Sequence, residues 1–122
     1  MRVLIADDSD LIRDRLQQML RQYGQVDIVG SFDNGTGALE ALHHFRPDLA
    51  IIDYKMPGLS GLEVLKGIRK ESTAIKIVIL TFYSSDYYRQ LAMQNGADYF
   101  FSKADDFEKI SLVVEEMMEN AT

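Results

Sequence analysis

The sequence predicts an α/β fold, a doubly wound five-stranded parallel sheet with helices on both faces. Short runs rich in β-branched residues alternate five times with stretches in which apolar residues recur every three or four positions, and this alternation is typical of repeated strand and crossover-helix units. Several of the short runs are apolar at consecutive positions, as expected for strands covered on both faces. The 122 residues, 47% hydrophobic and 26% charged, suit one globular domain, so we expect residues 1–122 to form a single domain.

The predicted strands and helices follow one another without a linker, an internal repeat or a low-complexity tract. The five strands are Val3 to Ala6, Val26 to Gly30, Leu49 to Asp53, Lys76 to Thr81 and Tyr99 to Ser102. Capping residues, apolar spacing and glycine or proline stops predict five helices. The first opens near Ser9 or Asp10 and closes at Gly24, the second follows Gly37 and ends before Pro47, the third is Leu62 to Lys70, the fourth runs from about Ser85 to Asn95, and the fifth holds Phe107, Ile110, Val113, Val114 and Met117.

Composition and charge narrow the classes of function. The formal net charge of -6 argues against direct nucleic-acid binding, which depends on clustered lysine and arginine. The chain has no cysteine, so disulfides and thiolate chemistry are excluded. The apolar run after Arg2 is far shorter than a signal-peptide core or a membrane-spanning helix. We therefore expect a cytoplasmic protein that does not contact the membrane, and no output domain within these residues.

Five polar residues stand where predicted strands end. Asp7 and Asp8 follow the first strand, and the other three are Asp53, Thr81 and Lys103. Because ligands of open parallel sheets bind outside the carboxyl ends of the strands, we expect these side chains to share one edge. A single aspartate at a strand end more often caps a helix or a turn, but capping requires no matching threonine and lysine. Three crowded carboxylates repel one another, and a hard divalent cation such as Mg²⁺ would offset that repulsion.

Four segments around these residues resemble the response-regulator receiver family of two-component signalling, which includes chemotaxis regulators. The segment Asp53 to Gly61 is similar to the family's phosphoacceptor loop, with Met-Pro three residues after the aspartate and Gly eight after it. Asp7 and Asp8 resemble the acidic pair, Ile77 to Thr81 the fourth strand, and Gly96 to Lys103 the approach to the lysine. The resemblance covers essentially the whole chain and implies a flavodoxin-like receiver fold with strand order 2-1-3-4-5.

The resemblance also implies roles for these residues. Asp53 would accept a phosphoryl group from a histidine kinase or a phosphotransfer protein, giving an aspartyl phosphate. Asp8, Asp53 and the main-chain carbonyl of Lys55 would bind Mg²⁺, with Asp7 acting through water. The protein would catalyse its own phosphorylation and dephosphorylation without being an enzyme for a separate substrate.

The implied output is a two-state switch. Lys103 would hold a phosphoryl oxygen, Thr81 would be drawn toward the phosphoryl group, and Phe100 would turn inward to fill the vacated space. The face built from the fourth helix, fifth strand and fifth helix would then bind a partner or form a homodimer. Aromatic residues gather there, and partner contact and burial in the core explain them equally well.

Three positions depart from the family pattern. Ala104 follows Lys103 where proline is common, so we expect a trans peptide bond or a strained one, because a non-proline cis bond costs about 2.5–4 kcal/mol. Phe82 stands where a small residue is usual at the mouth of the pocket, which predicts slow entry of the phosphoryl group and slow hydrolysis. Phe100 has no hydroxyl, so it can report its position by packing alone.

Three alternatives remain open. The chain can be the receiver portion of a longer DNA-binding response regulator. An aspartyl-phosphate phosphatase would carry a second acid two residues after the nucleophile, where this sequence has Lys55. A flavodoxin-like cofactor binder would need a phosphate-binding loop rich in Gly, Ser and Thr after the first strand, and the sequence has none there.

Overall fold

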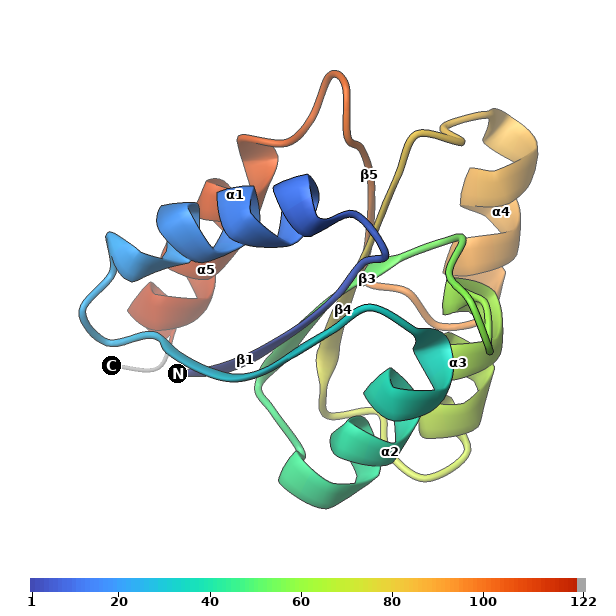
Figure 1. Cartoon of the computed structure of the whole chain (residues 1–122), viewed down its shortest axis with the longest axis horizontal. Coiled ribbons are helices and arrows are strands. Elements are labelled where there is room, and N and C mark those ends of the chain that lie inside the picture. Colours follow the sequence, from blue (N-terminus) through green and yellow to red (C-terminus); the bar gives the residue numbers. More distant parts are fainter. Residues whose placement is uncertain (121–122) are drawn as a thin grey trace.

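A computed structural model describes residues 1–120, in which five strands and five helices alternate (Figure 1). Their order is β1 (Arg2–Ala6), α1 (Asp10–Arg21), β2 (Asp27–Phe32), α2 (Gly35–Phe45), β3 (Leu49–Asp53), α3 (Gly61–Arg69), β4 (Lys76–Thr81), α4 (Asp86–Gln94), β5 (Tyr99–Ser102) and α5 (Lys109–Asn120). All strands are parallel in the order β2-β1-β3-β4-β5, which confirms the predicted fold class and strand order. The predicted domain of residues 1–122 includes residues 121 and 122, which lie outside the described residues.

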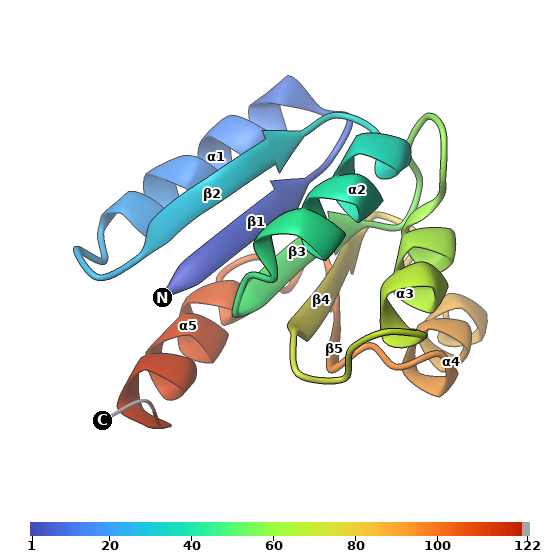
Figure 2. The same cartoon turned by 90° about the horizontal axis from the view of Figure 1, so that it is seen from below.

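The sheet separates two hydrophobic cores. Helices α1 and α5 cover one face, and α2, α3 and α4 cover the other (Figures 1 and 2). Every residue of the central strand β3 is buried, because its side chains point alternately into the two cores. This double cover explains why the strand is apolar at consecutive positions until it reaches Asp53. No helix among residues 1–120 is long and apolar enough to cross a membrane.

Two predicted boundaries were wrong by two or three residues. Strand β2 ends at Phe32, two residues beyond the predicted Gly30, and its pairing with β1 shifts by one residue at an irregularity between Val3 and Leu4. Helix α2 was predicted to follow Gly37 but begins at Gly35, because the Asn34 side chain accepts a hydrogen bond from the Gly37 N–H and caps the first turn.

Two other predictions concern helix ends. Helix α1 ends at Arg21, three residues before the predicted Gly24, and the chain leaves it through a turn in which the Tyr23 N–H donates to the Leu20 carbonyl. Phe107 precedes α5 and so lies outside the helix that was predicted to hold it, although its side chain is buried in the same core. The remaining strand and helix ends agree with the prediction to within one residue.

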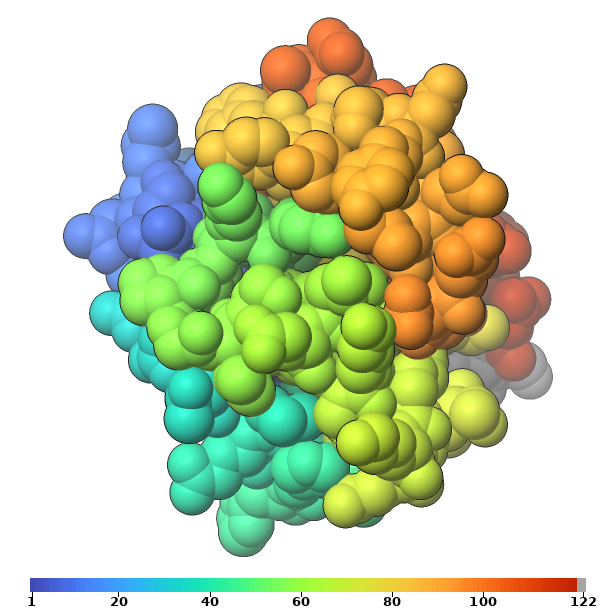
Figure 3. Space-filling model, turned by 90° about the vertical axis from the view of Figure 1, so that its right-hand side faces the viewer, coloured from blue at the N-terminus to red at the C-terminus, as the bar shows by residue number. Residues whose placement is uncertain are grey.

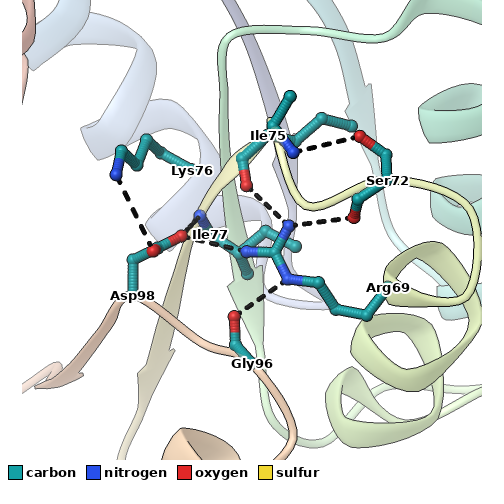
Figure 4. A network of polar contacts seen from close by, with 8 residues as sticks. Arg69, Ser72, Ile75, Lys76, Ile77, Gly96 and Asp98 are labelled. Carbon is teal, nitrogen blue, oxygen red and sulfur yellow. Dashed lines mark hydrogen bonds and ion pairs between the residues drawn. The ribbon is translucent and has the colours of Figure 1, made fainter.

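Arg69, in the last turn of α3, makes a network of polar contacts with residues near the starts of β4 and β5 (Figure 4). Strand starts lie at the end of a parallel sheet opposite the strand-end aspartates. Its guanidinium donates to the carbonyls of Ile75 at 2.8 Å and Gly96 at 2.9 Å, and to the Asp98 carboxylate at 3.0 Å. The same Asp98 oxygen accepts the Ile77 N–H at 2.8 Å. One partly buried ion pair therefore joins α3, the start of β4 and the turn before β5.

Candidate functional site

The carboxyl ends of four strands bring the predicted site residues to one edge of the sheet. Asp7 continues β1 by one residue, because its N–H donates to the Phe32 carbonyl of β2 at 2.9 Å. Lys103 continues β5 in the same way, with its N–H 2.9 Å from the Thr81 carbonyl of β4. Asp53 is the last residue of β3, between these two pairs of strands. The backbone ladder thus fixes where each of these side chains begins.

The three predicted aspartates form one cluster. Asp7, Asp8 and Asp53 each offer a carboxylate oxygen, and these oxygens lie within 4.8 Å of one another. Asp7 and Asp53 are buried, with 1% and 5% of their surface exposed, whereas Asp8 is exposed. The cluster is therefore open to solvent on the side of Asp8 and closed on the side of the other two carboxylates.

The ammonium of Lys103 lies inside this cluster. Its Nζ is 2.7 Å from Asp7 Oδ2 and 3.1 Å from Asp53 Oδ2, and the Lys103 side chain is only 4% exposed. Asp7 Oδ2 is buried, and the Lys103 ammonium is its ion-pair partner, whereas no backbone N–H among residues 1–120 donates to it. One positive charge faces three carboxylates, which leaves the cluster negative.

The charges around Asp53 change its acidity. Burial, and after it the neighbouring Asp7 carboxylate, raise the pKa of Asp53, whereas Lys103 lowers it, and the net result is a pKa of about 7. Without an added cation, Asp53 therefore exchanges its proton near neutral pH. Such a carboxylate gains more from a divalent cation than an ordinary surface aspartate does.

The donor set fits Mg²⁺. Only oxygen ligands are offered, the buried Asp7 Oδ2 accepts no backbone N–H among the described residues, and exposed Asp8 leaves room for the waters that Mg²⁺ usually keeps. A hollow of about 440 Å³ adjoins the cluster; its lining residues are Asp8, Lys55, Met56, Pro57, Gly58, Ser60 and Glu63. The site is thus reachable from solvent along the loop that follows Asp53.

Glycine at position 61 lets this loop turn back onto the site. The Gly61 N–H donates to the Tyr54 carbonyl at 2.8 Å, and a Cβ at position 61 would clash with the Asp53 carbonyl oxygen. Ser60 and Glu63 then form a capping box at the start of α3. The spacing of eight residues between Asp53 and Gly61 therefore has a steric reason.

Thr81 and Phe100 are both buried. The Thr81 side chain is completely inaccessible, and its Oγ1 accepts the Tyr83 N–H at 3.0 Å. Phe100 is 2% exposed, so its ring occupies the inward position. The guanidinium carbon of Arg89, on α4, lies 5.0 Å from the centroid of that ring.

Two aromatic side chains flank the mouth of the site. The exposed ring of Phe82 lies 5.2 Å from Lys103 Nζ, and the Tyr83 ring lies 4.8 Å from Lys55 Nζ. The sequence predicted a bulky residue at the mouth but neither of these cation–π contacts. The Lys103-Ala104 peptide bond is trans, because residues 1–120 contain no cis bond, and this is one of the two expected outcomes.

Sequence reasoning missed three residues that support the site. The Ser102 hydroxyl accepts the N–H groups of Ala104 and Asp105, both at 3.2 Å, and so shapes the loop after Lys103. The tendency of serine to hydrogen-bond nearby backbone groups is the signal that could have indicated it. Arg13 donates to the Asp7 carbonyl at 2.7 Å, and the Ser9 N–H donates to Asp7 Oδ1 at 2.9 Å. No simple sequence pattern predicts the Arg13 contact.

Curated relatives share this sequence over most of its length. The response regulator GacA of Pseudomonas aeruginosa is 32% identical over 109 residues, which cover 89% of this chain and 51% of GacA. The probable transcriptional regulatory protein NarL of Mycobacterium tuberculosis is 32% identical over 102 residues, which cover 84% of this chain and 47% of NarL. The chain thus spans about half the length of these relatives.

Solved structures and a family model agree with the curated relatives. The signal receiver domain of the putative response regulator NarL from Mycobacterium tuberculosis superposes with a TM-score of 0.85 at 30% identity, covering 93% of each chain. A DNA-binding response regulator of the LuxR family from Staphylococcus aureus gives a TM-score of 0.86 at 30% identity, covering 94% of this chain and 96% of the other. The model of the response regulator receiver domain matches residues 3–115. The chain therefore belongs to the response-regulator receiver domain family of two-component signalling.

Proposed function

We propose that Asp53 is the phosphoacceptor and that a histidine kinase or a phosphotransfer protein is the donor. An Asp53 oxygen attacks the phosphorus of a phosphohistidine, the bond between phosphorus and the imidazole nitrogen breaks, and the released imidazole keeps the electron pair. The observation that carries this proposal is the position of Asp53. It ends the central strand, with Lys103 3.1 Å away and the carboxylates of Asp7 and Asp8 beside it.

The neighbouring residues prepare this carboxylate for phosphorylation. Asp8, Asp53 and the carbonyl of Lys55 would hold Mg²⁺ directly, and Asp7 would hold it through water. When bound, the ion neutralises charge on the phosphoryl oxygens during transfer. The buried ammonium of Lys103 would hold a further phosphoryl oxygen, which its distance of 3.1 Å from Asp53 supports. The Thr81 hydroxyl, which now accepts the Tyr83 N–H, would donate to another phosphoryl oxygen.

On this proposal the domain catalyses its own phosphorylation and dephosphorylation, because the residues that bind the phosphoryl group all belong to the acceptor. Phosphatase activity on a separate aspartyl phosphate is not supported, because Lys55 occupies the position of the second acid. We further propose a cytoplasmic location, as in other signalling between kinases and receivers.

The proposed partner surface is the face formed by α4, β5 and α5, which would bind a target or a second copy. Tyr83 and Tyr87 are exposed at 45% and 66% near its α4 side, and exposed tyrosine is common in protein interfaces. Figure 3 shows α4, in orange, on the outer surface beside α3, with α2 on the far side of α3. The net charge of -6 argues that this domain does not bind DNA itself. Because one structural relative is described as a DNA-binding response regulator, a longer protein containing this domain remains the alternative.

Intact mass spectrometry after incubation with a small phosphodonor and Mg²⁺ tests the assignment. We expect one added phosphoryl group in the wild type and none in Asp53→Ala. Asp105→Ala is a matched control, since Asp105 is an exposed acid outside the cluster, and it should be phosphorylated like the wild type. No added mass, or equal addition to the wild type and Asp53→Ala, would overturn the proposal.

A further inference from the structure

Arg89 contacts Phe100, the buried aromatic residue of the expected switch, in two ways. Its guanidinium carbon lies 5.0 Å from the centroid of the Phe100 ring, and its Nη1 donates to the Phe100 main-chain carbonyl at 3.1 Å. The ring is 2% exposed, so the inward position of Phe100 is the one in which Arg89 lies over it. If the ring turned outward, the stacking would be lost even if the backbone hydrogen bond remained.

The backbone hydrogen bond is part of a cap on the outer edge of β5. Alternate residues of a strand direct their backbone groups to opposite sides, and β5 pairs only with β4 within residues 1–120. On the free side, Arg89 satisfies the Phe100 carbonyl, and the Asp106 carboxylate accepts the Ser102 N–H at 3.0 Å. Two side chains thus occupy this edge where another strand could otherwise pair.

Few other contacts anchor α4. Ala92 is the single fully buried residue in this helix, all of which the structure describes. Tyr88 is partly buried and packs edge-on against Tyr54, with ring centroids 5.0 Å apart. Arg89 therefore provides a large share of the polar attachment between α4 and β5, and it does so at the switch residue itself.

We propose that Arg89 is a positioning residue that holds Phe100 inward and couples the position of its ring to α4. The inference rests on the proposed function of Asp53 and Thr81. Phe100 has no hydroxyl with which to signal its position, whereas a guanidinium stacked on its ring responds directly to its rotation. In the switch that the family resemblance implies, Phe100 lies inward when Thr81 is drawn toward a phosphoryl group. By holding the ring inward, Arg89 would favour that conformation and, by linkage, raise the affinity of the site for a phosphoryl analogue.

The test uses 4-fluorophenylalanine labelling and ¹⁹F NMR. The chain has six phenylalanines, and Phe100→Leu identifies the Phe100 resonance. Arg89→Met removes the charge and the planar donor group but keeps the length, and Arg89→Lys keeps the charge. Arg15→Met is the matched control, because Arg15 lies 3.9 Å over the ring of Phe107, away from the switch.

In Arg89→Met without ligand, the Phe100 resonance should gain the shift between H₂O and D₂O that marks an exposed ring, and Arg89→Lys should recover part of the wild-type signal. The affinity for beryllofluoride with Mg²⁺ should fall about two- to fivefold, the size expected for one exposed cation–π contact. Arg15→Met should match the wild type in both measurements.

The inference is overturned if Arg89→Met leaves the Phe100 resonance unchanged, or if Arg15→Met moves it equally. Failure of the proposed function gives a different result, because the wild type would then bind no beryllofluoride. In that case the ligand-free Phe100 resonance still decides whether Arg89 holds the ring inward.

Discussion

Lys103 Nζ lies 3.1 Å from Asp53 Oδ2, and both side chains are almost completely buried at the carboxyl edge of the sheet. The lysine lowers the pKa of Asp53, but burial and the Asp7 carboxylate raise it more, so the pKa reaches about 7. The carboxylate must be ionised to attack phosphorus or to bind a metal ion. Protons and Mg²⁺ therefore compete for Asp53 within the physiological pH range.

Magnesium affinity should consequently depend on pH. Above about pH 7 Asp53 is ionised without a metal ion, and the affinity should approach a plateau. Below that value Mg²⁺ must displace a proton, so the affinity should fall by up to about tenfold per pH unit. Isothermal titration calorimetry at pH 6, 7 and 8 measures this slope. Asp53→Asn should bind more weakly and lose most of the dependence, and an equal slope in both proteins would contradict the prediction.

The same pKa predicts how stability changes with pH when no metal ion is present. Asp53 has a raised pKa in the folded state, so its contribution is fully present below the unfolded value of 3.8 and is lost as the pH rises through about 7. Asparagine at position 53 cannot ionise, so Asp53→Asn should raise the free energy of unfolding at pH 8 by about 2 kcal/mol. This is less than the full pKa shift of Asp53 implies, because nearby solvent screens the charge. At pH 4 the variant should match the wild type.

Urea denaturation in EDTA at the two pH values gives these free energies. Asp8→Asn is a useful comparison, because Asp8 is exposed and its charge is better solvated, so a smaller gain at pH 8 is expected. A gain for Asp53→Asn that is the same at both pH values would show that ionisation is not its cause.

The site could be predicted from the sequence because a parallel sheet carries its strand ends to one edge. Residues that end adjacent parallel strands lie close together, as Asp53, Thr81 and Lys103 do. The strands themselves can be predicted from the pattern of apolar residues in the sequence. The contacts of Arg69 could not be predicted in the same way. It pairs with Asp98, 29 residues away, and the pairing depends on where a loop and a helix end come together in space.

Contacts that depend on side-chain conformation could not be predicted from the sequence either. The sequence predicts that Phe82 stands at the mouth of the site, but its distance from Lys103 depends on the rotamers of both residues. The register shift between β1 and β2 leaves no clear sequence signal at Val3 and Leu4. The pKa of Asp53 follows from burial and from the distances to Asp7 and Lys103, so it too requires the structure.

Phe82 should slow hydrolysis of the aspartyl phosphate. Its exposed ring lies 5.2 Å from Lys103 Nζ, which is itself 3.1 Å from Asp53 Oδ2, and we expect it to hinder an attacking water. Phe82→Ala should hydrolyse about tenfold faster, a change in barrier of about 1.4 kcal/mol. Loss of the phosphorylated mass with time, after removal of the phosphodonor, measures the rate. Tyr87→Ala removes another exposed ring without a contact to Lys103 and should leave the rate unchanged.

A wild-type half-life shorter than seconds would contradict this prediction, as would equal rates in the wild type and Phe82→Ala. Faster phosphorylation of Phe82→Ala by a small phosphodonor is expected as well, because the same ring narrows the entry of the phosphoryl group.

Arg69 should matter for stability but not for phosphorylation. Arg69→Met leaves the partly buried Asp98 carboxylate without its guanidinium and removes hydrogen bonds to the Ile75 and Gly96 carbonyls. Losing hydrogen bonds from a charged group in this way costs about 1.5–3 kcal/mol. Lys66→Met, on the exposed side of the same helix, should change the free energy of unfolding by less than about 0.5 kcal/mol. Urea denaturation at pH 7 measures both variants. Arg69 contacts the residues just before β4 and β5, at the end of the sheet opposite Asp53, so folded Arg69→Met should still accept one phosphoryl group. A loss below about 1 kcal/mol would show that the pair is not structural.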